Sequence, residues 1–425
     1  MCCPRRMRAP AFTAAALLAL LALAAAEVRF AATDAASSDG SYGVAGGGAA
    51  SGAQPRDASA AAARSIDEPP VPASIAPEAA PRGAGLEVRA QSRIARPHPH
   101  HPECAQELRI SAALPGGASC SVSGLLAGGW RNRVTVSNTA GGTRSFLLVL
   151  PRGYAAGPPL PLLLALHGGA AYATNFLDFS YLDTRGIHAG FAVAAPDGLP
   201  GTLGVGGVWR LQNAAGDGSG DVHPDVDDVA FVADVAGCVA ALGVPLSDRL
   251  ALAGFSLGAK FATRVACSPP PGFSAIAVAV AAGLQEPRPA TCRVPLLMFQ
   301  GSADPQVPFC IRAAQLGPMA YWPTRLHFEA WLLSNGADEA AQSQRCSLLG
   351  DSVLYKYPGG APTKLLWTQG GSHVWPGALA GCSGDGTDVA LSFLADPSQP
   401  LPCDGLAACT RDPPCGAAWT GASMR

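Results

Sequence analysis

The sequence predicts an α/β fold in which a mostly parallel sheet is covered by helices on both faces. Three observations support this. Short, nearly continuous apolar runs recur along the chain, segments with helical spacing alternate with them, and glycine-rich turns follow several of the runs. Parallel strands buried on both faces are apolar throughout, and they need crossover connections between them. The pattern occupies roughly residues 125–396, which we interpret as one α/β domain.

The predicted elements follow one another in a regular order. The strands are apolar runs bounded by turn residues, namely Thr143–Leu150, Leu160–Leu166, Phe191–Pro196, Arg249–Gly254, Ala275–Ala282, Val294–Gln300, Ser352–Tyr357 and Lys364–Thr368. The helices are the longer segments between or after them, namely Val226–Leu242, Leu257–Cys267, Leu326–Leu333 and Thr387–Leu394.

The composition permits a sizeable core and disfavours one class of partner. Of the 425 residues, 48% are hydrophobic and only 14% are charged. The formal net charge is -2. A protein that binds nucleic acid by charge presents a basic face. We therefore expect no nucleic-acid partner.

The N-terminus has the features of a secretory signal peptide. Arg5, Arg6 and Arg8 precede an apolar run, Ala11–Ala26, that ends in three alanines. A positive start, a short apolar segment and a small-residue cleavage site define such peptides. The run is shorter than the roughly 20 residues that span a bilayer. We predict a signal peptide over residues 1–26 and a secreted protein with no membrane contact after cleavage. The alternatives are an uncleaved anchor that leaves the protein at the cell surface, and a plastid transit peptide.

The thirteen cysteines fit an oxidising compartment. Removal of Cys2 and Cys3 with the signal peptide leaves an odd number, so at least one is free or pairs between chains. Their spacing predicts disulfide bonds without assigning the pairs. No C-x-x-C pair occurs, which disfavours a metal site built from cysteines.

The chain divides into four parts by composition. Residues 27–104 are rich in Ala, Gly, Ser and Pro, which predicts a disordered linker because too little apolar surface is available to bury. The α/β domain is assigned to residues 105–396, and a Cys- and Pro-rich tail to residues 397–425.

Two segments have metal-ligand residue types, but we predict no metal site. One ends the linker and contains His98, His100, His101 and Cys104. A segment without a fold does not preform a site, so a solvated tail is the preferred interpretation. The other is the acidic run Asp217–Asp228, whose spacing fits no standard calcium loop. We interpret it as a surface loop that leads into a capped helix.

A serine lies between two glycines at the junction of a predicted strand and a predicted helix. The pentapeptide Gly254–Gly258 reads G-F-S-L-G and is a G-x-S-x-G motif. That motif marks a nucleophile when a strand precedes it and a helix follows it, because the serine then sits on a strained, exposed turn. Both elements are predicted here, so Ser256 is the candidate nucleophile. The alternative is an ordinary strand-to-helix turn with Ser256 as a helix N-cap.

A serine hydroxyl needs a base, and the base needs an orienting acid. Only His327 and His373 follow Ser256 in the chain. His327 lies in a helix-like stretch and is interpreted as structural, whereas His373 lies in a glycine-rich loop after the last predicted strand and is the candidate base. Asp304 follows the end of another predicted strand, at the sheet edge where ligand sites collect, and is the candidate acid. Asp304 could instead cap a turn before Pro305.

The remaining requirement is a pair of backbone N–H groups for the developing oxyanion. The residue after the nucleophile, Leu257, is the first candidate donor. The second comes from the His167-Gly168-Gly169 sequence that directly follows the strand Leu160–Leu166. Gly169 is the preferred donor, and Ala170 is the neighbouring alternative.

Several motifs together resemble one family. In chain order, these motifs are L-H-G-G, P-D-G, V-W-R, D-D-V-A-F-V, G-F-S-L-G, G-S-A-D-P-Q-V-P-F and G-G-S-H-V-W-P-G. The five that have not yet been located lie at Pro196–Gly198, Val208–Arg210, Asp227–Val232, Gly301–Phe309 and Gly370–Gly377. Over roughly residues 130–395, the chain resembles the secreted polyhydroxybutyrate depolymerase and feruloyl esterase family of α/β-hydrolases.

The resemblance implies an α/β-hydrolase fold and a carboxylic ester hydrolase without a cofactor. Ser256, His373 and Asp304 would form the triad, and the predicted substrate pocket includes His167, Trp209 and Trp375. The implied substrate is an ester, including polymeric plant cell-wall or polyester material. A serine peptidase of the same fold and a catalytically inactive, surface-binding relative are the alternatives.

The chain also departs from the family pattern. Gln300-Gly301 stands where members usually have His-Gly, and alanines replace glycines after both the L-H-G-G and the G-F-S-L-G motifs. The shape of the acyl pocket and the natural ester are therefore not carried over.

Overall fold

The structure is a computed structural model. It describes residues 109–138, 142–201, 206–211, 226–268, 272–281, 292–310, 324–347, 351–377, 379 and 382–409. All of them belong to the compact unit formed by residues 79–425. The predicted signal peptide, the linker with its histidine motif and most of the acidic run Asp217–Asp228 lie outside the described residues.

One large sheet runs through the described part of the chain. Its thirteen strands lie in the order β1 (Arg109–Ala113), β2 (Ser119–Ser123), β3 (Arg131–Asn138), β4 (Gly142–Val149), β6 (Ala192–Pro196), β5 (Leu160–Leu166), β9 (Leu246–Phe255), β10 (Ala275–Ala279), β11 (Leu296–Gly301), β14 (Thr363–Thr368), β13 (Ser352–Tyr357), β12 (Ser343–Cys346) and β15 (Ala407–Ala408). A second sheet contains β7 (Leu199–Pro200) and β8 (Gly207–Val208).

The pairing directions identify the fold. The six strands from β6 to β14 run parallel to their neighbours, and the flanking strands are antiparallel. The chain passes from β4 to β5 and returns to insert β6 between them. A parallel core with this crossed order and antiparallel strands before it is the α/β-hydrolase fold. The predicted fold class is therefore confirmed.

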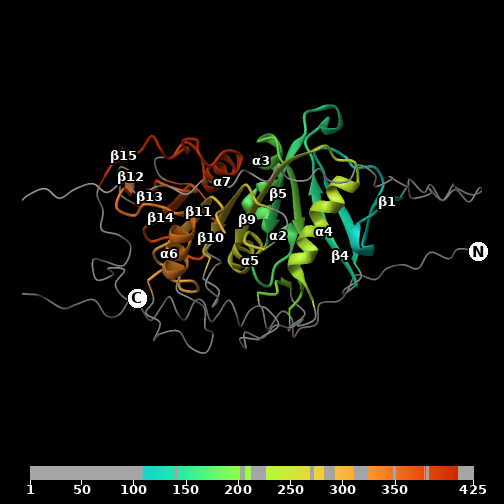
Figure 1. The fold of residues 1–425 in the computed structure, drawn as a ribbon, viewed down its shortest axis with the longest axis horizontal. Helices are drawn as coiled ribbons and strands as arrows, with labels where there is room; N and C mark the ends of the chain where they lie inside the picture. Colours follow the sequence, from blue (N-terminus) through green and yellow to red (C-terminus); the bar gives the residue numbers. More distant parts are fainter. Residues whose placement is uncertain are drawn as a thin grey trace, which may run out of the picture. The chain divides into compact units, whose positions relative to one another are not determined.

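Helices cover both faces of the sheet, as Figure 1 shows. One face is covered by α4 (Asp228–Ala241), α5 (Leu257–Val265) and α6 (Thr324–Asn335), and the other by α2 (Ala173–Ser180), α3 (Leu182–His188) and α7 (Gly386–Ala395). Side chains of β5 alternate between the two cores: Leu162 and Leu164 face the first, and Leu163 faces the second. Alternation with apolar residues on both sides explains why this strand is an unbroken apolar run.

The N-terminal strands β1 to β3 form an antiparallel meander that the sequence analysis did not include. Its strands are short and half polar, with the alternation typical of a sheet exposed on one face. In β3, Val134 and Val136 are buried, whereas Arg131 and Arg133 on the other face are exposed. The helices α2 and α3 were also missed.

The D-D-V-A-F-V motif anchors helix α4 to the sheet. Asp227 accepts a hydrogen bond from the N–H of Ala230 and caps the helix. Asp228 forms a buried ion pair with Arg144 of β4. The guanidinium of Arg144 also lies 3.6 Å from the ring centroid of Phe231. The two buried charges therefore pair with each other, as buried charges require, and the guanidinium also packs on an aromatic ring.

The segment after α7 joins the sheet. Strand β15 pairs with β12. Disulfides join Cys346 to Cys409 and Cys382 to Cys403, so this segment is held at two points. Two further disulfides join Cys120 to Cys238 and Cys267 to Cys292, and Cys310 is also disulfide-bonded. Disulfide pairs of this number fit the predicted oxidising compartment.

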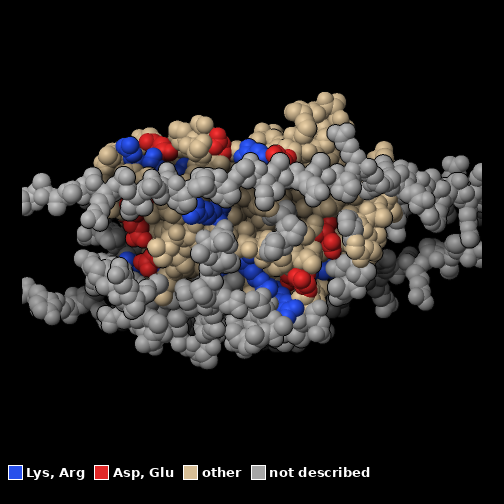
Figure 2. All heavy atoms as spheres, in the orientation of Figure 1, with Lys and Arg blue, Asp and Glu red and all other residues tan. Residues whose placement is uncertain are grey.

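The surface of the described residues is mixed in charge. On the face shown in Figure 2, acidic and basic side chains lie in small groups of both signs. Within the described ranges, no helix has the length and apolar character that crossing a membrane requires.

Candidate active site

The backbone at Ser256 is a sharp turn between strand β9 and helix α5. Ser256 has φ 52° and ψ −116°, a conformation that is costly for any residue other than glycine. A Cβ on Gly254 would lie 2.6 Å from the carbonyl oxygen of Gly258. A Cβ on Gly258 would lie 2.2 Å from the carbonyl oxygen of Leu166. Both glycines of the motif are therefore required by the packing of this turn.

Three side chains form a hydrogen-bonded chain at the carboxyl edge of the sheet. The Nε2 atom of His373 lies 2.9 Å from the Oγ of Ser256, and its Nδ1 atom lies 2.9 Å from the Oδ2 of Asp304. Ser256 follows β9, Asp304 follows β11 and His373 follows β14. The structure thus brings together the three residues selected from the sequence as candidate nucleophile, base and acid.

The surroundings of Asp304 keep its carboxylate ionised. Burial alone would raise the pKa of Asp304, but hydrogen bonds from His373 and from backbone N–H groups outweigh it, so that the pKa is lowered. The N–H groups of Gln306 and Val307 donate to Oδ1 at 2.8 Å each. The turn interpretation of Asp304 and the acid interpretation are therefore compatible, because each carboxylate oxygen serves one of them.

The loops that carry the acid and the base contact each other through glycine. A Cβ on Gly301 would lie 2.2 Å from the carbonyl oxygen of Gly371. The N–H of Ala303 donates to that same carbonyl at 2.9 Å, and the N–H of Gly370 donates to the Oγ of Ser302 at 2.7 Å. The relative position of acid and base is consequently determined by backbone contacts.

The geometry distinguishes between the two candidate donors in the loop after β5. The N–H of Ala170 donates to the carbonyl oxygen of Gly207 at 3.0 Å. Within the part of the chain that the structure describes, the N–H groups of Gly169 and Leu257 donate to no other residue. A Cβ on Gly169 would lie 3.5 Å from the Cδ2 of Leu257, so the two residues are neighbours. This arrangement favours Gly169 over Ala170 as the partner of Leu257.

Two of the predicted pocket residues lie beneath the site and do not face a substrate. His167 is fully buried: its Nε2 accepts from the N–H of Gly198 at 2.9 Å, and its Nδ1–H donates to the carbonyl of Gly168 at 2.7 Å. Burial lowers its pKa, which keeps the imidazole neutral. Trp209 is 2% exposed and donates to the carbonyl of His167 at 2.8 Å. These contacts hold the loop after β5. The assignment of both residues to the pocket lining is therefore corrected: their buried side chains support this loop.

Trp375 follows the candidate base but is also largely buried. Its Nε1–H donates to the Oγ1 of Thr387 at 2.9 Å, and its ring packs edge-on against Phe176 with centroids 5.3 Å apart. Trp375 therefore holds the His373 loop against α2 and α7, and a direct contact with substrate stays a prediction.

An aromatic surface that was not predicted from the sequence lies beside His373. The ring of Phe255 lies 5.3 Å from that of His373, and the ring of Phe179 lies 5.5 Å from that of Phe255. Phe179 is 45% exposed, and Val374 next to the base is 56% exposed. Phe255 was visible in the motif as the residue before the nucleophile. Phe179 belongs to the missed helix α2, so nothing in the sequence connected it with the site.

The other histidine after the nucleophile is in a different place. His327 is 4% exposed in α6, and the Nε1–H of Trp331 donates to its Nε2 at 3.2 Å. Its interpretation as a structural residue agrees with this position. Among the residues that the structure describes, no group of three or more His, Cys, Asp or Glu is arranged to hold a metal ion.

Comparison with known proteins gives a distant match in sequence. No family model matches the chain. Feruloyl esterase B of Piromyces equi is 23% identical over 244 residues, which are 54% of this chain and 42% of that protein. The chain therefore matches less than half the length of this relative.

Several of the solved structures that match the chain are esterases or depolymerases by name. They include a poly(3-hydroxybutyrate) depolymerase from Bordetella parapertussis, at 20% identity, 65% coverage of this chain, 92% coverage of that chain and a TM-score of 0.40. An acetyl xylan esterase from Aspergillus awamori has 16% identity, coverages of 54% and 89%, and a TM-score of 0.39. With TM-scores this low, the fold of the chain is established by its own strand order. The sequence match and that strand order agree with the resemblance inferred from the motifs: the chain is similar to the feruloyl esterase and polyhydroxybutyrate depolymerase group of α/β-hydrolases.

Proposed function

We propose that the protein is a secreted serine esterase that hydrolyses carboxylic esters through Ser256, His373 and Asp304. The observation that carries this proposal is the hydrogen-bonded chain of these three side chains next to a strained turn. The match to a feruloyl esterase supports carboxylic ester hydrolysis as the reaction class.

In the proposed reaction, His373 takes the proton of Ser256 as the serine oxygen attacks the ester carbonyl. The N–H groups of Gly169 and Leu257 stabilise the negative oxygen of the tetrahedral intermediate. His373 then protonates the leaving alcohol, and the acyl group remains on Ser256. A water molecule, deprotonated by His373, releases the acid. Asp304 holds the imidazole in the required tautomer and stabilises its charged form.

The aromatic surface beside the base supports aryl and hydroxyalkanoate esters as the substrate class. Phe179 and Val374 expose apolar area next to His373, where an acyl or aryl group would contact them. Replacement of Phe179 by Ala is expected to raise KM for methyl ferulate more than KM for an acetate ester. An equal effect on both esters would contradict a contact with the aryl group.

The decisive experiment compares Ser256→Ala with the unchanged protein on short p-nitrophenyl esters, methyl ferulate and polyhydroxybutyrate film. We expect hydrolysis to disappear in the variant, with a matched control, Ser123→Ala on the exposed face of β2, unaffected. The ranking of substrates then selects between aryl and polyester hydrolysis. Hydrolysis retained by a folded Ser256→Ala protein would rule the mechanism out. Inactivity of the unchanged protein, without labelling by a fluorophosphonate, would favour the surface-binding alternative, and cleavage of peptides alone would favour the peptidase.

A further inference from the structure

A cavity lies at the opposite edge of the sheet from Ser256. It has a volume of about 630 Å³ and is lined by residues from β12, β13, the start of β14 and the segment after α7. Thr363 begins β14 at this edge, and Tyr357 ends the antiparallel strand β13 beside it. His373 follows the other end of β14. The cavity is thus separate from the candidate active site.

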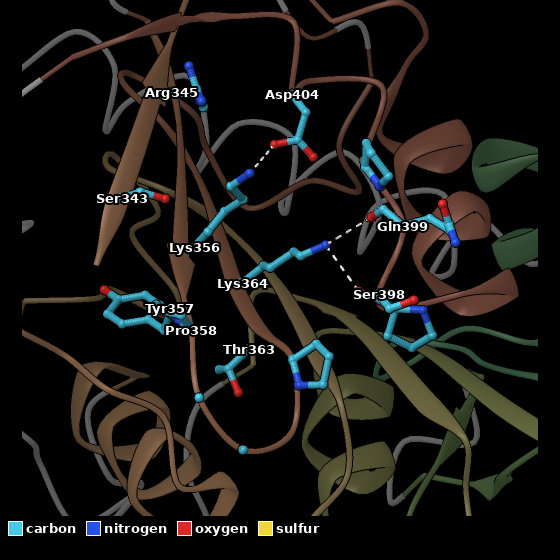
Figure 3. Close-up of a pocket in the computed structure, with 15 residues that line it drawn as sticks. Ser343, Arg345, Lys356, Tyr357, Pro358, Thr363, Lys364, Ser398, Gln399 and Asp404 are labelled. Atoms are coloured by element: carbon cyan, nitrogen blue, oxygen red, sulfur yellow. Dashed lines mark hydrogen bonds and ion pairs between the residues drawn. The ribbon is translucent and has the colours of Figure 1, made fainter. Parts of the chain in front are cut away.

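Three cations line this cavity, which Figure 3 shows from close by. Lys356 and Lys364 are directly opposite each other in the antiparallel pair of β13 and β14. Ser343 pairs with Lys356, and the alternation of side chains along β12 places Arg345 on the same face. Like charges that face each other across two strands destabilise a sheet. Nevertheless, two of the chain's three lysines occupy such positions.

The protein itself engages only part of the hydrogen-bonding capacity of these cations. Lys356 donates to the Oδ1 of Asp404 at 2.5 Å. Lys364 donates to two backbone carbonyls, those of Pro397 at 3.2 Å and Gln399 at 3.3 Å. Since an ammonium group has three donors, each lysine retains at least one. Three cations and one carboxylate leave the cavity with a positive charge.

Arg345 differs from the two lysines because its side chain has no hydrogen-bond or ion-pair partner in the described part of the chain. Its Nε atom is buried without a partner. A guanidinium carries five donors in a planar arrangement that matches a carboxylate or a sulfate. Burial of an unpaired donor is costly, so an occupant of the cavity would remove that cost.

The lowered pKa of Lys364 also indicates that its charge is not fully offset by its neighbours. Burial lowers its pKa, and the neighbouring Lys356 lowers it further, against the opposite influence of Asp404 and Asp396. A bound anion would reverse the unfavourable contribution of Lys356.

We propose that this cavity is a binding site for an organic anion, with the acid group held by Arg345 and Lys356. Cavities of 300 to about 1,000 Å³ hold organic molecules, so this one is too large for a single oxyanion. The rest of its wall includes the hydroxyl of Ser343 and the side chains of Ser398 and Gln399, which donate to Asp396 and keep acceptor oxygens for a hydroxylated ligand. A sugar acid combines both features. No residue of the proposed triad takes part, so this site does not depend on the proposed esterase reaction.

The first test measures binding of three probes to the full chain by titration calorimetry at low ionic strength. We expect glucuronate to bind, neutral glucose not to bind, and inorganic sulfate to bind more weakly than glucuronate. Binding of glucuronate is expected to weaken as salt is added, because the interaction is between charges. Equal binding of glucose and glucuronate, or no binding of glucuronate, would overturn the proposal. Equal or tighter binding of sulfate would overturn the assignment of an organic ligand and would show that the site binds inorganic anions.

The second test uses variants of Arg345, whose side chain has no polar partner among the described residues. Arg345→Gln is expected to weaken glucuronate binding at least tenfold, and Arg345→Lys is expected to restore part of it. The matched control is Arg152→Gln, which removes the same charge from an exposed position. Arg152 follows β4, a strand that is distant from β12 in the sheet. Glucuronate affinity that is unchanged in Arg345→Gln would refute the proposal. Because the Arg345 side chain makes no hydrogen bond or ion pair among the described residues, the variant is expected to fold.

Discussion

The two edges of the central sheet differ in how their polar groups are satisfied. At the carboxyl edge, Ser256, His373 and Asp304 hydrogen-bond to one another, and backbone N–H groups complete the shell of Asp304. At the amino edge, the side chain of Arg345 has no hydrogen-bond or ion-pair partner among the described residues. A group that must react in a fixed direction is held before substrate arrives. A group that only binds does not need to be held in this way, because its ligand supplies the missing hydrogen-bond partner.

The edges differ also in backbone strain. Ser256 has a positive φ, and its two flanking glycines admit no side chain. The cavity at the amino edge is built on the regular pairing of β12, β13 and β14. A positive φ thus falls on a side-chain-bearing residue at Ser256, as is common for active sites, whereas beside the cavity the positive φ values belong to glycines, Gly359 and Gly360. Four predictions test this contrast, from the largest expected effect to the smallest.

Replacement of Asp304 by Asn should have the largest effect. The amide cannot hold His373 in the required tautomer or stabilise its charged form, so kcat is expected to fall about 10⁴-fold with little change in KM. Steady-state hydrolysis of a p-nitrophenyl ester measures both constants. Asp248→Asn, an exposed change in β9, is the control. A fall of less than tenfold would mean that Asp304 acts only as a turn residue.

Replacement of Gly258 by Ala should damage both the fold and the activity. The new Cβ would meet the carbonyl oxygens of Leu166 at 2.2 Å and His167 at 2.3 Å. We expect the free energy of unfolding to fall by about 3 kcal/mol or more, since such contacts require backbone movement. Urea denaturation measures the loss. Gly272→Ala, where a Cβ meets nothing within 4 Å, should change stability by less than about 1 kcal/mol.

Buried Lys260 in α5 should make stability depend on alkaline pH. Burial lowers its pKa to about 8, although the charge of Asp304 opposes this. The unfolded chain has the ordinary value of about 10.4, so it binds more protons than the folded protein between these two values. The free energy of unfolding should therefore rise with pH from about 8 to about 10.4. Urea unfolding across this range measures the slope, and Lys260→Met should reduce it. A slope that is the same in both proteins would contradict burial of the ammonium.

The smallest effects are expected at the amino edge. Lys356→Gln removes an ion pair that is partly exposed and should lower stability by less than about 1 kcal/mol. Arg345→Gln removes no hydrogen bond or ion pair among the described residues and should change stability by less than about 0.5 kcal/mol. Thermal denaturation measures both. A marked destabilisation by Arg345→Gln would show that this arginine has a structural role.

The same contrast explains how much could be predicted from the sequence. The parallel strands were recognised because burial on both faces makes them continuous apolar runs; Leu160–Leu166 was placed at its observed ends. The three residues of the proposed triad could be selected because they lie in short motifs next to strand ends, and the structure places their side chains together. The meander β1 to β3 was missed because its short strands are half polar and were not distinguished from loops.

The cavity at the amino edge has no local signal in the sequence. Its residues come from three strands and a loop, and Lys356 and Lys364 become neighbours only through the register of β13 and β14. A shift of one residue would send one of them to the opposite face. His167 and Trp209 were misplaced for a related reason, because a motif shows that a residue belongs to a site but does not show which way its side chain points.

The spacing of the triad along the chain has a consequence for folding. His373 is 117 residues from Ser256 and 69 from Asp304, and the three follow β9, β11 and β14. Contacts this distant in sequence form late, because long loops must close before they are made. During refolding, labelling of Ser256 by a fluorophosphonate should lag behind the recovery of helical signal. The active serine would thus report the moment at which β14 docks and the sheet is complete.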